Sequence, residues 1–157
     1  MFRKTEPAAD IKALLMSQKF AVLSTLEERH PYLSLVAFAA TEDLRTVFFA
    51  TPKGSRKYEN ISSKAGVALL IDNRSNEISD ISEAMAVTVL GTASEVGEMD
   101  RENSLSVYLE KHPYLQEFLE MPSTTLVQVE VESYILVSHF QKVSTVHMKS
   151  QPPLSHI

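Results

Sequence analysis

The residues best suited to chemistry lie in the run 51–57 (TPKGSRK), which pairs a glycine-containing loop with two cations. The pattern predicts the end of a strand, a loop and the first turn of a helix that Ser55 caps. Helix N-termini expose unpaired N–H groups and attract anions. Arg56 and Lys57 in that first turn oppose the helix dipole unless a phosphate lies there. The run therefore predicts a phosphate site; the alternative is a capped helix with two solvated cations.

Other catalytic and metal-binding patterns are weak. The histidines are His30, His112, His139, His147 and His156. None of them forms the i, i+4 pair of a helical metal site, so we interpret them as surface or hydrogen-bonded side chains. The chain has no cysteine and no G-x-S-x-G motif, which argues against disulfides, thiolate sites and a serine hydrolase. We therefore predict no metal site.

Hydrophobic periodicity divides the chain into strands and a few helices. Helices are expected at 8–18, 56–61 and 100–111, with a further helical stripe at 114–119. Strands are expected at 20–26, 32–40, 46–50, 67–71, 86–96, 126–131 and 134–140, with a bulge or bend at Gly91. The polar stretch 73–83 shows no obvious element. Residues 1–148 are expected to form one domain and 149–157 a loose tail.

Short connections between the strands favour antiparallel neighbours, because a parallel crossover needs about a dozen residues. The pattern predicts a mainly β protein, an antiparallel barrel or sandwich of six or seven strands with helices packed outside. Apolar strands such as 67–71 (VALLI) and 47–50 (VFFA) suggest more hydrophobic surface than short helices can cover, which favours a homodimer.

Composition excludes several functional classes. The net charge is −5, without the basic excess typical of nucleic-acid binders. No apolar stretch is as long as a membrane helix, and the acidic, polar N-terminus does not resemble a secretory signal. We therefore expect a cytoplasmic protein that binds neither nucleic acid nor membrane.

The order of these segments resembles the pyridoxamine 5′-phosphate oxidase-like family, the FMN-binding split barrels. The resemblance extends from about 20 to 140, and the Gly-Ser-Arg-Lys run after a strand ending in threonine is its most specific part. It implies a homodimer that binds FMN in two clefts between the subunits. By position, Arg56 and Lys57 would hold the FMN phosphate, with Ser55 and Thr51 adding contacts.

The resemblance also places a second strand beside the ribityl chain and the flavin ring. The residues concerned are Ser34, Leu35, Val36 and Ala37. Their backbone groups can bond the flavin edge whatever their side chains are. The implied activity is a flavin-dependent oxidoreductase with an unknown small substrate. This would explain why no catalytic acid–base pair is visible, since the cofactor supplies the reactivity.

Some features depart from the family pattern. The position close to Ala86 lacks the polar residue that reaches the flavin in true oxidases, and the C-terminus lacks their substrate-binding segment. We therefore expect poor oxidation of vitamin B6 compounds. The alternatives are a non-catalytic flavin sensor or carrier, or a haem-binding split barrel with His139 or His147 as axial ligand. Relatives of this fold also bind the deazaflavin F420.

Overall fold

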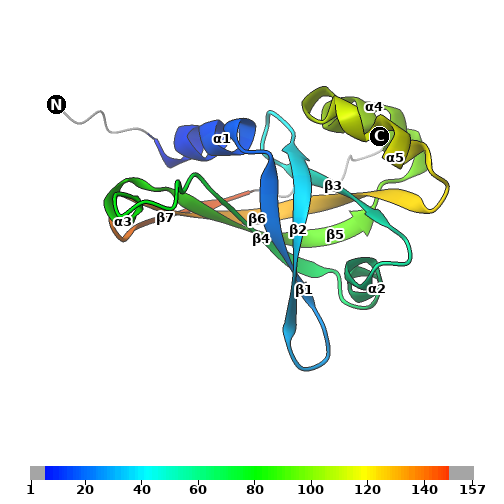
Figure 1. The fold of residues 1–157 in the computed structure, drawn as a ribbon, viewed down its shortest axis with the longest axis horizontal. Helices are drawn as coiled ribbons and strands as arrows, with labels where there is room; N and C mark the ends of the chain where they lie inside the picture. Colours follow the sequence, from blue (N-terminus) through cyan, green and yellow to red (C-terminus); the bar gives the residue numbers. More distant parts are fainter. Residues whose placement is uncertain (1–5, 149–157) are drawn as a thin grey trace, which may run out of the picture.

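The computed structural model describes residues 6–148 of the chain (Figure 1). The strands are β1 (Phe20–Leu26), β2 (Pro31–Ala40), β3 (Thr46–Pro52), β4 (Gly66–Asp72), β5 (Ala86–Glu95), β6 (Thr124–Ser138) and β7 (Lys142–His147). The helices are α1 (Pro7–Ser17), α2 (Arg56–Ser63), α3 (Asp80–Glu83), α4 (Glu98–Lys111) and α5 (Gln116–Glu120), with the 3-10 turn η1 (Pro113–Leu115) before α5.

The sheet closes on itself into a barrel. Its strands are antiparallel neighbours in the order β3-β2-β1-β4-β5-β6-β7, and β3 also pairs with β6. That extra pairing closes β1 to β6 into a six-stranded barrel, and β7 extends the sheet beyond β6. One edge of β6 pairs with β5, while the other pairs first with β3 and then with β7. The predicted mainly β antiparallel barrel with flanking helices is confirmed.

The C-terminal strands differ from the prediction. β6 is one continuous strand where the sequence indicated two, because the polar residues at its centre lie at a bulge rather than in a turn. The strand ends at Ser138, since His139, Phe140 and Gln141 take positive φ angles and reverse the chain. The following residues, for which we predicted no element, form β7. Its side chains do not alternate between apolar and polar strongly enough to reveal an edge strand.

The polar stretch 73–83 also contains an unpredicted element, the short helix α3. The Asp80 carboxylate accepts hydrogen bonds from the backbone N–H groups of Ser75, Asn76 and Glu77. These bonds hold the pKa of Asp80 below its usual value, the Ser75 backbone contact being the main cause. A local network of this kind leaves no hydrophobic periodicity in the sequence.

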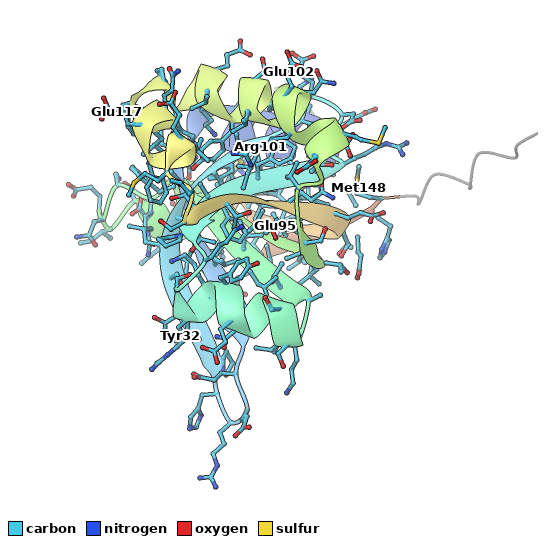
Figure 2. The ribbon with its side chains drawn as sticks, turned by 90° about the vertical axis from the view of Figure 1, so that its right-hand side faces the viewer. Tyr32, Glu95, Arg101, Glu102, Glu117 and Met148 are labelled. Atoms are coloured by element: carbon cyan, nitrogen blue, oxygen red, sulfur yellow. The ribbon has the colours of Figure 1, made fainter. Side chains whose placement is uncertain are left out.

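Two buried clusters hold the fold together. The larger fills the barrel and includes Leu23, Phe49 and Val89, while α1 closes one end of it with Leu14 and Leu15. The smaller lies between the outside of the barrel and the helices α4 and α5, and it contains Ala39, Phe48, Val96, Tyr108, Leu119 and Leu126. Figure 2, which looks onto one end of the barrel, shows α4 and α5 above the strands and α2 below them.

The exposed apolar surface is not where the sequence suggested. Val47 and Phe49 are fully buried and Phe48 is only 4 % exposed, so this strand needs no partner chain to cover it. That part of the argument for a homodimer is wrong. Instead Leu33 and Leu35 are 63 % and 72 % exposed. Phe20, Leu26 and Leu70 are also exposed, and strand pairing places these five on the outward face of β1, β2 and β4. We call them the outer apolar face.

Gly91 is expected to be intolerant of any side chain. A β-carbon there would lie 2.3 Å from the Glu130 carbonyl oxygen, and the strand register shifts between Leu90 and Gly91. This confirms the predicted bulge. We expect Gly91→Ala to lower the free energy of unfolding by about 1–3 kcal/mol, as in other overpacked sites. Gly66→Ala is the matched control, because its β-carbon meets nothing closer than 3.8 Å. Equal urea midpoints for the two variants would contradict this.

Candidate functional site

Strands β2 and β3 pair only briefly and then diverge. Their pairing covers Phe38↔Phe49 to Ala40↔Val47. From there β2 stays paired with β1 back to Pro31, and β3 stays paired with β6 as far as Pro52. No strand in residues 6–148 pairs with the other edge of β2 before Phe38. Residues 34–37 therefore have one backbone edge without a strand partner beside the end of β3.

The four β2 residues of the predicted flavin site have different environments. The Ser34 hydroxyl is buried and has no hydrogen-bond partner in the described part of the chain. Leu35 belongs to the outer apolar face, and Val36 is buried in the barrel core. The Ala37 carbonyl accepts a hydrogen bond from the Tyr108 hydroxyl at 3.0 Å. Buried hydroxyls rarely lack a partner, so Ser34 fits a site where a ligand supplies one.

The loop between β3 and α2 is held by its own hydroxyl groups. Thr51 is fully buried, and its hydroxyl lies 2.7 Å from that of Ser55. Ser55 is the N-cap of α2 and its side chain accepts a hydrogen bond from the Tyr58 N–H, so the predicted cap is present. This arrangement fixes the N-terminus of α2 at the end of β3.

The two predicted cations begin α2. The Arg56 guanidinium lies 5.1 Å above the Tyr32 ring, and Tyr32 is on the same side of β2 as Ser34. Arg56 also lies 3.8 Å from the Glu27 carboxylate, and both side chains are largely exposed. Lys57 is half-buried and takes part in no ion pair within residues 6–148. The structure thus brings Arg56 to the predicted flavin strand.

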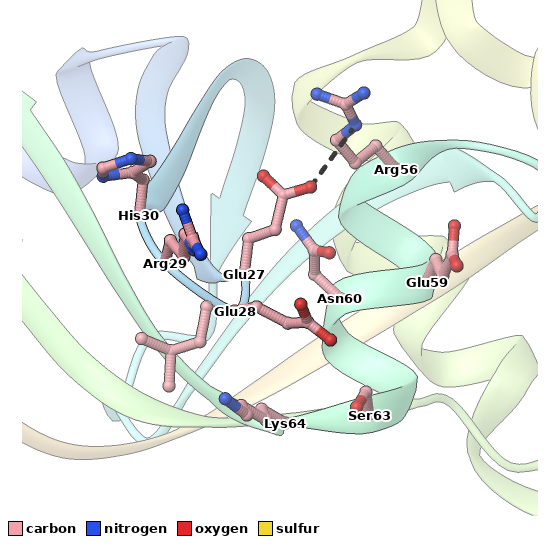
Figure 3. Close-up of a pocket in the computed structure, with 10 residues that line it drawn as sticks. Glu27, Glu28, Arg29, His30, Arg56, Glu59, Asn60, Ser63 and Lys64 are labelled. Carbon is pink, nitrogen blue, oxygen red and sulfur yellow. Dashed lines mark ion pairs between the residues drawn. The ribbon is translucent and has the colours of Figure 1, made fainter.

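Beside Arg56 lies a polar cleft of about 560 Å³. Figure 3 shows it between the turn that joins β1 to β2 and one side of α2, with the Glu27–Arg56 ion pair at its rim. Asn60 is buried there and donates to the Thr25 hydroxyl at 3.0 Å. That bond ties α2 to β1 and holds the helix N-terminus in place.

A network next to the loop was not visible in the sequence. Glu95 accepts hydrogen bonds from the hydroxyls of Thr125, at 2.6 Å, and Tyr58, at 3.2 Å. Lys53 lies 3.6 Å from the same carboxylate. These contacts lower the pKa of Glu95, the Thr125 hydroxyl most strongly. The residues come from three separate segments, so only the strand register brings them together.

Helix α4 fixes the carbonyl groups of β2. The buried His112 ring donates from Nε2 to the Phe38 carbonyl at 2.7 Å, and its Nδ1 accepts from the Tyr114 hydroxyl at 3.0 Å. Beside it, the Lys111 amine donates to the Leu15 carbonyl at 2.8 Å and lies 3.9 Å above the Phe38 ring. Burial lowers the pKa of His112, and it lowers that of Lys111 to about 8.

Because of this cluster, stability is expected to rise with pH in two windows, one on the acid side of neutrality from His112 and one on the alkaline side from Lys111. In the unfolded chain, His112 has a pKa near 6.5 and Lys111 a pKa near 10.5. In the folded chain both pKa values are lower, so each group binds its proton only at a lower pH. Stability rises with pH wherever the unfolded state binds more protons. It should therefore fall below pH 6.5 and increase between about 8 and 10. Above about 10, the raised pKa values of Tyr108 and Tyr134 oppose the trend.

Urea denaturation at a series of pH values checks this prediction. Lys111→Met should remove the rise on the alkaline side, whereas Lys12→Met, at an exposed position of α1, should leave it. Parallel pH profiles for the two variants would show that Lys111 is not the source.

The structure does not gather the remaining histidines. His139 lies in the turn between β6 and β7, next to the start of β7. His147 is the last residue of β7 and pairs with Ser133, near the middle of β6, so the two histidines lie at opposite ends of β7. His30 is exposed in the β1–β2 turn. The described residues contain no group of three or more side chains that could hold a metal ion. His156 lies outside the described residues.

The family model for pyridoxamine 5′-phosphate oxidase matches residues 8–138, most of the chain. The chain belongs to this family. The resemblance noted in the sequence is therefore confirmed. Among the described helices, none is both long and apolar enough to cross a membrane. No curated protein matches the chain.

Solved structures with the same fold bind different groups. A haem-binding protein from Mycobacterium smegmatis superimposes with a TM-score of 0.82 at 14 % identity, covering 93 % of this chain and 60 % of its own. An FAD-binding protein from Mesorhizobium loti has a TM-score of 0.64 at 16 % identity, with coverages of 87 % and 97 %. General stress protein 26 from Bacillus anthracis has a TM-score of 0.68 at 18 % identity, covering 89 % and 97 %. At identities this low, the likeness to these structures shows a shared fold and nothing about what this chain binds.

Proposed function

We propose that this protein binds FMN between the diverging strands β2 and β3 and acts as a flavin-dependent oxidoreductase on a small substrate. One observation carries the proposal. The N-terminus of α2, with Ser55, Arg56 and Lys57, lies beside a free strand edge that contains an unpartnered buried hydroxyl. The site therefore offers an anion-binding helix end and unused backbone groups side by side.

Each residue has a defined role in this proposal. Arg56 and Lys57 hold the phosphate, and Ser55 and Thr51 shape the loop that presents the helix end. The backbone of 34–37 and the Ser34 hydroxyl bind the ribityl chain and ring edge. FMN, when bound, supplies hydride and electron transfer, so the chain needs only to position the ring and admit a substrate.

The Glu27–Arg56 ion pair is compatible with this role. It is exposed and 3.8 Å long, and such pairs contribute little to stability. A dianionic phosphate would compete well for Arg56, because a guanidinium can bind it with two parallel hydrogen bonds.

We also propose a homodimer built on the outer apolar face. Leu35 of that face lies next to Ser34 in β2, so a partner covering the face would border the flavin site. Contiguous exposed apolar side chains of this kind mark interaction surfaces.

Titration of the cofactor-free protein tests the proposed function. FMN fluorescence and visible absorption should show saturable binding, with riboflavin at least about tenfold weaker because it lacks the phosphate. Haem and F420 are the competing ligands, suggested by the haem-binding neighbour and by the family. A Soret band with tight haem binding and no FMN binding would overturn the assignment. Turnover of NAD(P)H by the FMN-loaded protein separates an enzyme from a sensor or carrier.

Oxidation of pyridoxamine 5′-phosphate is expected to be inefficient. That substrate has its own phosphate and needs a second anion site. After Phe140, the described part of the chain offers Lys142 as its only lysine or arginine, on the ordered strand β7. Lys149 and the predicted loose tail lie outside the described residues. Loss of remote binding energy lowers turnover as well as affinity. A kcat/KM of about 10⁴ M⁻¹s⁻¹ or more in an oxygen-coupled assay would contradict this.

A further inference from the structure

A second cleft lies between the helices α4 and α5 and the ends of β3, β5 and β6. Its volume is about 520 Å³, within the range of small-molecule sites. Its apolar lining includes Val96, Leu105, Leu109 and Leu119. Figure 2 labels Arg101 beneath α4 and Glu95 nearer to α2 at this end of the molecule. The cleft plays no part in the proposed flavin site, although both border the 51–57 loop.

The cleft contains a buried hydroxyl without a partner. Thr124 is only 5 % exposed, and its Oγ1 atom forms no hydrogen bond with any described residue. Its backbone N–H already donates to the Met121 carbonyl, so the side chain is not needed for the turn before β6. Because buried hydroxyls are nearly always bonded, Thr124 marks a place for a polar atom from outside the chain.

The cleft also contains an arginine with spare bonding capacity. Within residues 6–148, the Arg101 guanidinium forms one hydrogen bond, of 3.5 Å, to the Leu119 carbonyl, and no ion pair. Three carboxylates line the same cleft, yet none lies within 4.0 Å of Arg101. Glu95, one of the three, is already held by Lys53 and Thr125. A planar guanidinium in this position is suited to a planar anion.

We propose that this cleft binds a small organic monocarboxylate with an apolar body. Arg101 binds the carboxylate, the leucine-lined wall covers the body, and Thr124 supplies a further hydrogen bond. Glu98 and Glu120, exposed at the rim, repel a second negative charge. The site therefore favours a monoanion over a dicarboxylate or a phosphate ester.

Calorimetric and NMR titrations of the full chain with benzoate test the proposal. Benzoate should bind saturably and shift the amide signals of Leu105, Leu119 and Thr124. Acetate lacks the apolar body, benzyl alcohol lacks the charge and phenyl phosphate has a second charge, so each should bind at least about tenfold more weakly.

Variants assign the binding to the cleft. Arg101→Gln should weaken benzoate about ten- to a hundredfold, since it removes a charge-assisted contact. Thr124→Val should weaken it several-fold, whereas Thr124→Ser should retain binding. Arg74→Gln is the matched control, because Arg74 is paired with Asp72 far along the chain from the cleft. If Thr124→Val does not fold, Arg101→Gln and Thr124→Ser still decide the question.

Three results would overturn the inference: no saturation below about 10 mM benzoate, an Arg101→Gln variant that binds as the parent does, or signal shifts confined to other regions. If Thr124 binds only water, the benzoate titration will not saturate. The titration is run with and without FMN. Benzoate binding without FMN binding would reject only the flavin proposal, and the reverse would reject only this one.

Discussion

Replacing Arg56 or Lys57 with alanine is expected to weaken FMN binding by about ten- to a hundredfold. Each variant removes a charge-assisted phosphate contact that is worth about 1.5–3 kcal/mol. Both side chains begin α2, next to the Ser55 cap, so their removal leaves the barrel core intact. Fluorescence titration of the cofactor-free proteins measures the effect.

Three comparisons sharpen this test. Riboflavin should respond little to either change, because it has no phosphate. Glu27→Gln should strengthen FMN binding modestly, since it frees Arg56 from its only ion pair in the described chain. Arg45→Ala removes an exposed arginine that is paired with Asp43 and should have no effect. Parent-like FMN affinity in both the Arg56 and Lys57 variants would show that the phosphate lies elsewhere.

Replacing Leu35 with glutamate is expected to split the proposed homodimer. The side chain is 72 % exposed in one chain, so the variant should still fold. In a dimer built on the outer apolar face, however, the new carboxylate would be buried without a partner. That penalty is several kcal/mol, enough to raise the dimer dissociation constant more than about a hundredfold.

Sedimentation at low micromolar concentration measures the outcome. The parent should have about twice the chain mass of 17.6 kDa, and Leu35→Glu should have the mass of one chain. Met99→Glu is the matched control, because Met99 is 97 % exposed on α4 and lies outside the outer apolar face. A parent protein of single-chain mass, or a Leu35→Glu variant that remains dimeric, would reject this interface.

Local sequence patterns predicted the strands, the helix cap and the bulge, whose structures depend mainly on neighbouring residues. Short apolar, β-rich runs identified β1 to β5, and the serine, arginine and lysine at 55–57 identified the start of α2, because caps and short strands depend on neighbouring residues. The bulge at Gly91 was found for the same reason. The residues of β6 that lie opposite this bulge were not predicted. Glu132 and Ser133 were interpreted as a break between two strands, whereas they lie within β6, where its register with Leu90 and Gly91 shifts.

The rest of the candidate site depends on contacts between distant segments. His112 is unremarkable in the sequence, yet it bonds to the Phe38 carbonyl across 74 positions. The unpartnered hydroxyls of Ser34 and Thr124 have no sequence signal at all, because an absent hydrogen bond is visible only once the neighbours are placed. The sequence also did not predict most residues of the outer apolar face, because a short apolar run does not show which of its side chains face inward.

The pairing of β3 with β6 has a consequence for how the chain reaches its native state during synthesis. Residues 46–52 leave the ribosome long before residues 124–130, their partners along one edge. Until then the far edge of β3 is an open template for other strands, and the barrel cannot close. Contacts of such long sequence separation also slow folding. We therefore expect closure to be a late event, and nascent chains that end before β6 to be the species most in need of chaperones.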